Sequence, residues 1–124
     1  MEKSMGKVTI APNVLVTIVQ KTADSVPGVD QLCTNLPGVK RWLGLHSVGQ
    51  GVEVRVADDR VDVDVYLVAK RNVELLQMGR HLQREVTRAI QDIVGMQVSE
   101  VNVHIEDIAT ELGQDRDEAK GQAA

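Results

Sequence analysis

The sequence predicts an α+β fold: a β-α-β-β-α-β two-layer sandwich with two helices on one face of a mostly antiparallel sheet. Two segments repeat apolar residues at helical spacing along one stripe. Three others alternate apolar and polar residues, which is typical of a sheet with one buried face. The 124 residues suit a single domain, and the apolar content of 43% indicates a globular chain rather than a disordered one.

The first elements are an expected strand and an expected helix. GKVTI, at residues 6–10, is short and alternating, so we expect it to be the first strand. The period then changes, and Pro12 is acceptable in the first turn of a helix that Pro27 and Gly28 end. The apolar face of this helix is expected to contain Val14, Leu15, Ile18, Val19, Thr22, Ala23 and Val26.

Residues 30–50 follow no regular period and contain several glycines, so we expect a long loop there. Within it, Lys40 and Arg41 stand beside Trp42 and two leucines. One interpretation is a flap whose apolar residues pack onto the core. The other is a patch that docks a partner, because Trp and Arg are favoured at protein interfaces.

A β-hairpin is expected next, because the alternating stretches GVEVRVA and RVDVDVYLVAK are separated by DDR. The side chains expected to face the core are Val52, Val54, Val56, Val61, Val63, Val65 and Leu67. The side chains expected on the opposite, solvated face are Glu53, Arg55, Asp62, Asp64 and Tyr66.

The longest helix and a last strand complete the domain. The helix has an apolar stripe opposed by arginines, and Gly95 is expected to end it as a glycine C-cap does. The stripe comprises Leu75, Met78, Gly79, Leu82, Val86, Ala89, Ile90 and Ile93. In the last strand, SEVNVHIEDI, Val101, Val103 and Ile105 are expected inward. The domain is expected to span residues 1–112, with a flexible C-terminal tail at 113–124.

Two groups of side chains are candidates for function. Asp62, Asp64, Tyr66 and His104 form a candidate polar interface on the sheet face. The carboxylates there are interpreted first as a solvated face, then as a subunit interface, and last as a metal or catalytic site, since a flat face converges poorly on an ion. The candidate partner-binding residues are Lys40, Arg41, Trp42, Arg80, Arg84 and Arg88. The helical arginines either form a solvated, salt-bridged face or dock an acidic partner.

The sequence predicts no catalytic residue, metal site or cofactor. The three histidines lack zinc-ligand spacing, and no phosphate-binding glycine motif occurs. The net charge of −4 and the near absence of aromatic residues argue against nucleic acid, although RRM domains share this element order. A single cysteine, Cys33, fits a reducing compartment, and no apolar run approaches the roughly 20 residues that span a bilayer. We therefore expect a cytoplasmic protein without direct membrane insertion.

Three stretches resemble the alkaline shock protein family of Gram-positive and related bacteria. They are GKVTIAPNVLVTIVQKTADSVPGV, GVEVRV with VDVDVYLV, and MGRHLQREVTRAIQDIVGMQVSEVNVHIEDI, and together they cover about residues 6 to 108. Residues 30–50 and the tail do not match. The resemblance implies a small non-enzymatic cytosolic protein linked to cell-envelope stress and homeostasis. It further implies self-association and a membrane-anchored protein partner that holds the chain, peripherally, at the membrane.

Two other functions stay open from the sequence. The first is a small-ligand-binding regulatory module, with a site near the glycine-rich turn at residues 49–51. The second, and least favoured, is an enzyme that uses Asp62, Asp64 and His104.

Overall fold

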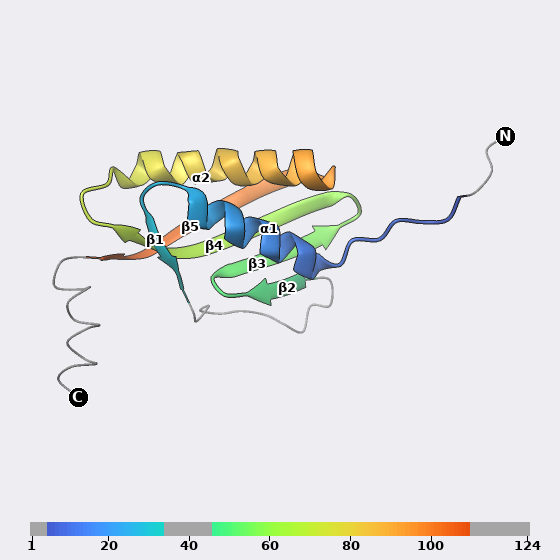
Figure 1. Cartoon of the computed structure of the whole chain (residues 1–124), viewed down its shortest axis with the longest axis horizontal. Coiled ribbons are helices and arrows are strands. Elements are labelled where there is room, and N and C mark those ends of the chain that lie inside the picture. Colours follow the sequence, from blue (N-terminus) through green and yellow to red (C-terminus); the bar gives the residue numbers. More distant parts are fainter. Residues whose placement is uncertain (1–4, 34–45, 110–124) are drawn as a thin grey trace, which may run out of the picture.

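The computed structural model describes residues 5–33 and 46–109. Helices α1 (Pro12–Ser25) and α2 (Leu75–Ala89) lie on one face of a five-stranded sheet, and α2 continues into a π-helical turn, η2 (Ile90–Val94) (Figure 1). The strands are β1 (Val29–Leu32), β2 (His46–Gly49), β3 (Val52–Ala57), β4 (Arg60–Lys70) and β5 (Gln97–Ala109). The predicted α+β class, with two helices on one face of a sheet, is confirmed.

Strand β4 is the centre of the sheet. β5 pairs with it in parallel along one edge, while β3 and then β1 pair antiparallel along the other edge. β2 pairs antiparallel with β3. The sheet is therefore mostly antiparallel, as predicted. Its parallel pair arises because α2 crosses over the sheet between β4 and β5.

The core consists of aliphatic side chains between the helices and the sheet. Of the hairpin residues predicted to face inward, Val56 is half-buried and the others are fully buried: Val52, Val54, Val61, Val63, Val65 and Leu67. Leu15 and Val19 of α1 and Leu82 and Val86 of α2 pack against them. Burial of each such side chain contributes about 1.5–3 kcal/mol to the free energy of unfolding. The apolar alternation seen in the sequence is thus the inner face of the sheet.

The strand expected at residues 6–10 is a prediction that the structure corrects. These residues belong to no strand, and the side chain of Val8 is 91% exposed. β1 and β2 lie instead at residues 29–32 and 46–49, within or next to the expected loop. Alternation indicates that a segment can form a strand, but a strand also needs an edge to pair with. On β4, the part of the edge that β3 leaves open is occupied by β1 and not by residues 6–10.

The buried faces of the helices also differ from the prediction at two places. On α1, Val16 is buried while Val14 is 46% exposed, so the helix is rotated relative to the expected face. On α2 the stripe is confirmed as far as Ile90, but Ile93 is 69% exposed. Ile93 lies in the π-helical turn, whose wider period moves its side chain away from the core. Gly95 ends this turn with a φ of +82°, as predicted.

Three predicted partner-binding residues, Lys40, Arg41 and Trp42, lie outside the described residues, as does the expected tail at 113–124. Within the described ranges, no helix combines the length and the apolar character needed to cross a bilayer.

Strands β1 and β3 meet end to end on β4 at Tyr66. The Tyr66 N–H donates to the Gly51 carbonyl at 2.8 Å, and the Tyr66 carbonyl accepts from the Cys33 N–H at 2.9 Å. Gly51 has a φ of +68°, and a Cβ atom there would lie 2.7 Å from the Leu32 Cβ and 2.8 Å from the Tyr66 carbonyl oxygen. The junction therefore requires glycine for both its conformation and its lack of a side chain.

Gly51→Ala is expected to lower the free energy of unfolding by about 2 kcal/mol or more, because left-handed strain adds to the overlap with β1 and β4. Gly95→Ala is the matched control, since Gly95 also has a positive φ but open space around its Cα. Gly95→Ala should lower the free energy of unfolding by about 1–2 kcal/mol, because only the left-handed backbone conformation is strained there. Urea denaturation of both variants measures the difference, and equal losses would contradict the close packing at Gly51.

Candidate functional site

A polar cluster covers the open face of the sheet, on the side away from the helices. The strand register brings it together: Glu53 pairs with Asp64, Arg55 with Asp62, and Tyr66 with His104. We call Glu53, Arg55, Asp64, Tyr66 and His104 the sheet-face cluster. The structure thus places the predicted residues Asp62, Asp64, Tyr66 and His104 on one face, with Asp62 beside the cluster.

Asp64 is the hub of the sheet-face cluster. One carboxylate oxygen lies 2.8 Å from Nε2 of His104, and the other lies 2.8 Å from a guanidinium nitrogen of Arg55. Arg55 also reaches the carboxylate of Glu53 at 3.7 Å. Asp64 and Glu53 are each only 8% exposed, so the expectation of a fully solvated face is wrong for these two carboxylates. The alternation within one strand predicts on which face of the sheet a residue lies. It does not predict that the pairing of the strands places partners from β3 and β5 around Asp64.

The Asp64 and Arg55 side chains stabilise each other's charge. Burial alone would raise the pKa of the Asp64 carboxyl, but hydrogen bonds with His104 and Arg55 outweigh it and hold this pKa below its usual value. Burial would also lower the pKa of Arg55, but the hydrogen bond to Asp64 and the negative charges of Asp64, Glu53 and Asp62 together outweigh that effect and raise this pKa. Both groups are therefore ionised at neutral pH, and Asp64 already accepts at both oxygens.

Tyr66 and His104 stack face to face beside Asp64. Their ring centroids lie 4.3 Å apart and the planes differ by 9°. Burial, and next the charge of Asp64, raise the pKa of the Tyr66 hydroxyl, so Tyr66 is neutral at physiological pH. Within the part of the chain that the structure describes, no group of three or more His, Cys, Asp or Glu side chains could hold a metal ion. The charged groups of Glu53, Arg55 and Asp64 and the imidazole of His104 are thus paired to one another, and Tyr66 joins the cluster through its ring.

The predicted arginine row lies on the exposed side of α2, away from the sheet-face cluster. Arg80, Arg84 and Arg88 are all exposed. Arg80 donates to the side-chain oxygen of Gln83 at 3.1 Å, and Arg88 lies 3.7 Å from the carboxylate of Glu85. This hydrogen bond and this ion pair support the interpretation of a salt-bridged helix face, and exposed contacts of this kind leave the guanidinium groups accessible.

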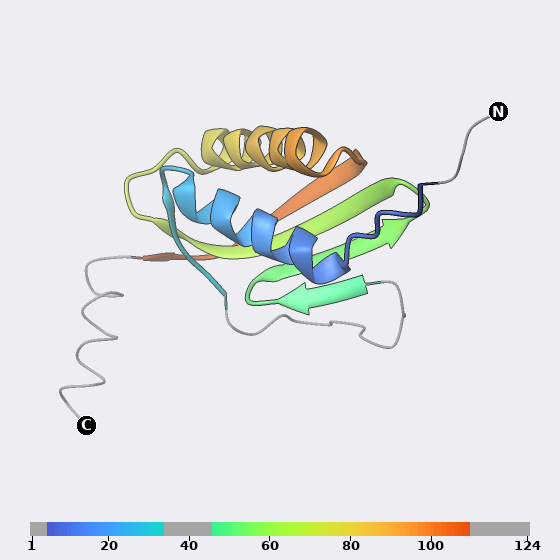
Figure 2. The same cartoon turned by 45° about the vertical axis from the view of Figure 1, so that its right-hand side comes forward.

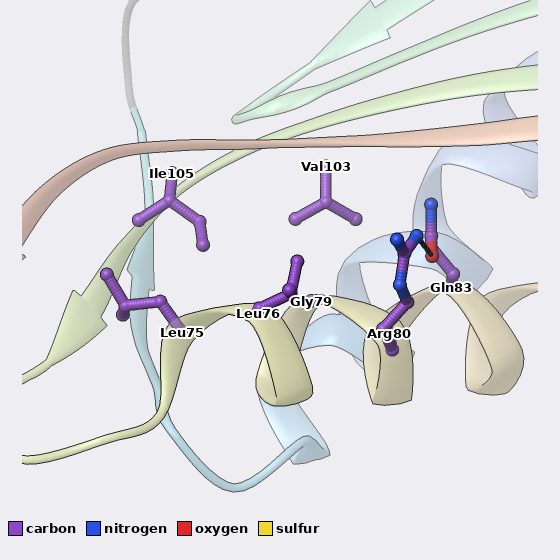
Figure 3. A pocket seen from close by; sticks show the side chains of 7 residues that line it. All are labelled: Leu75, Leu76, Gly79, Arg80, Gln83, Val103 and Ile105. Atoms are coloured by element: carbon purple, nitrogen blue, oxygen red, sulfur yellow. Dashed lines mark hydrogen bonds between the residues drawn. The ribbon is translucent and has the colours of Figure 1, made fainter.

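A groove between α2 and β5 was not predicted from the sequence. It has a volume of about 310 Å³ and is lined by Leu75, Leu76, Gly79, Arg80, Gln83, Val103 and Ile105. Figure 3 shows Val103 and Ile105 pointing from β5 toward the helix, across from Leu75 and Gly79. Gly79 leaves room because it has no side chain, and Gln83 donates to the Val101 carbonyl at 3.0 Å near one end. Gly79, which interrupts the apolar stripe of the helix, was the sequence feature that could have indicated this groove.

Comparison with known proteins gives a family and several relatives. Residues 1–110 match the model of the alkaline shock protein 23 family, described as having a cell envelope-related function. The protein YqhY of Bacillus subtilis (strain 168) is 32% identical over 102 residues, covering 82% of this chain and 76% of YqhY. A protein of Streptococcus pyogenes serotype M6 is 28% identical over 108 residues, covering 86% of this chain and 82% of its own. Among solved structures, a MamM CTD fragment matches with a TM-score of 0.47 and 13% identity, over 77% of this chain and 96% of the fragment.

Asp64→Asn is expected to lower the free energy of unfolding by about 1–3 kcal/mol at neutral pH, because the ion pair with Arg55 is lost. The folded-state pKa of Asp64 is below its unfolded value of 3.8, so its contribution is fully present above that value. The contribution is lost as the pH falls through the folded-state pKa.

Denaturation of the wild type and Asp64→Asn between pH 7 and pH 2 checks this sign, because the two stabilities should converge only in acid. Asp62→Asn, on the same face of the same strand, is the matched control and should cost less, since Asp62 is half-buried and more exposed than Asp64. A difference between wild type and Asp64→Asn that grows toward low pH would contradict the account.

Proposed function

Because this chain belongs to the alkaline shock protein 23 family, we propose that it is a non-enzymatic interaction protein of cell-envelope stress response and homeostasis. In this proposal it is cytoplasmic, self-associates, and docks on a membrane-anchored protein that holds it peripherally at the membrane. The single observation that carries the proposal is the match to a family with a cell envelope-related function over residues 1–110.

The geometry of the sheet-face cluster supports an interaction role over a catalytic one. Both carboxylate oxygens of Asp64 are already in contact with a partner, one with Arg55 and the other with His104. The carboxylate is therefore free neither to act as a general base nor to bind a metal ion. The stacked rings of Tyr66 and His104 lie over a flat surface, whereas catalytic and ligand sites are concave. A flat, half-buried polar surface with fixed side chains fits a protein partner, because little conformational entropy remains to be lost on binding.

The arginine row supports an acidic partner. Arg80, Arg84 and Arg88 lie at intervals of four residues, so they follow one side of α2 over two helical turns. An acidic helix or a stretch of acidic chain could contact all three guanidinium groups together.

A small-ligand module is the second candidate, and one observation favours it: the groove between α2 and β5 is apolar along Leu75, Val103 and Ile105. Its volume of about 310 Å³ is at the lower end for ligand pockets. The turn at Gly51 is a poorer site, because the Leu32 side chain and the Tyr66 carbonyl fill the space at its Cα. A metabolite that raises the melting temperature in wild type, and fails to do so in Gly79→Leu, would support this second function.

Reversal of the arginine row tests the docking proposal. In cells that express the chain naturally, crosslinking and mass spectrometry should detect an envelope-membrane protein bound to the wild type. Arg80→Glu/Arg84→Glu/Arg88→Glu should reduce those crosslinks roughly tenfold or more, because charges of like sign would then face each other.

Lys21→Glu/Arg60→Glu/Lys70→Glu is the control, since it makes the same change in net charge at exposed sites on other elements. It should retain the crosslinks. Equal loss in both triple variants, or a wild type that crosslinks to no envelope protein, would refute docking through this helix.

A further inference from the structure

The groove between α2 and β5 adjoins the one long strand at the edge of the described sheet. We infer that this edge takes the N-terminal segment, residues 5–10, of a second copy of this chain, which adds as a strand to β5 with its apolar side chains in the groove. The inference rests on the self-association in the proposed function and names the contact that produces it.

Strand β5 offers a free edge of unusual length. It runs from Gln97 to Ala109, and among the described strands it pairs with β4 alone. The side chains of Val103 and Ile105 point toward the helix layer but remain half-exposed, because nothing in the described residues covers the sheet beyond β5. A long edge with adjacent apolar side chains is a template for another strand.

The N-terminal segment has the properties of such a strand. It alternates apolar and polar residues, yet it is part of no strand in its own chain. Its apolar side chains are exposed: Met5 by 95%, Val8 by 91% and Ile10 by 39%. Figure 2 shows it running away from the body of the molecule at the start of α1. Large exposed side chains of this kind are a typical sign of a missing partner.

The two surfaces match in pattern and charge. In an antiparallel register, Val8 lies opposite Ile105 and Ile10 opposite Val103, so both enter the groove. The polar residues of the segment then lie on the open face of the sheet. Lys7 then lies opposite the irregularity of β5 between Ile105 and Asp107, where the carboxylates of Glu106 and Asp107 follow each other along the strand. An opposite-charge pair across two strands stabilises this register.

The segment cannot reach the groove of its own chain. If residues 7–10 lie along β5, only Ala11 connects them to Pro12, and one residue spans about 4 Å. Helix α1 packs against β1, β2 and β3, whereas α2 packs against β5. A strand beyond β5 lies three strand spacings from β3, about 14 Å. The occupant is therefore the segment of a second copy.

Analytical ultracentrifugation across a concentration series tests the contact. Val8→Asp and Leu76→Asp should each weaken self-association at least about tenfold. Their melting temperatures should equal that of the wild type at concentrations where the wild type is monomeric, since Val8 is 91% and Leu76 is 66% exposed. Ile93→Asp is the control, because it places the same charge on an exposed apolar position of η2 outside the groove. It should associate as the wild type does.

A charge exchange tests the register. Lys7→Glu and Glu106→Lys should each weaken association, and the double variant should restore it. Neither a loss of folding nor a general effect of charge would produce this recovery in the double variant. A double variant as weak as the two single variants would overturn the antiparallel register.

Mixed disulfides test the exchange between copies directly. In a Cys33→Ser background, a tagged chain with Val8→Cys and an untagged chain with Ile105→Cys should form a crosslinked heterodimer on mild oxidation. Absence of that heterodimer while the wild type self-associates would overturn the inference and leave the proposed self-association standing on another surface. A wild type that is monomeric at every concentration would overturn both.

Discussion

The pairing of β4 along both edges is the constraint on which the rest of the structure depends. Its inward valines form the centre of the core, and its outward side chains are fixed by neighbours on either side. Asp64 shows the consequence, because it receives Arg55 from β3 and His104 from β5 at the same time. Neither contact exists without the full register. The polar surface of this protein is thus a product of the same pairing that buries its core.

Much of this arrangement could be predicted from the sequence, and the failures have a common cause. The hairpin, the stripe of α2 as far as Ile90 and the glycine stop at Gly95 were predicted correctly, because each depends on a local period or a local backbone angle. The strand expected at residues 6–10 failed because pairing depends on which edge is available. The burial of Glu53 and Asp64 was not predicted, because it depends on residues of neighbouring strands. Asp64 and His104, for example, lie 40 residues apart in the sequence. The groove was missed because it forms between two elements that the sequence does not place side by side.

The molecule presents different surfaces on its two layers and at its edge. The sheet face carries paired, half-buried polar groups, and the outer side of α2 carries exposed arginines. The free edge of β5 carries apolar side chains beside a groove. The match to a family with a cell envelope-related function fits such a division, in which we propose that one surface joins copies while another contacts a partner at the membrane. In that proposal, the charge on α2 and the strand pattern at β5 set the specificity of these contacts.

Hydrogen–deuterium exchange at low and high protein concentration measures the central claim most directly, namely that this protein works through contacts between its own copies. We expect the amides of the N-terminal segment and of β5 to become protected together as the concentration rises, while those of β3 and β4 change little. Exchange that is independent of concentration, with the N-terminal segment unprotected throughout, would contradict it.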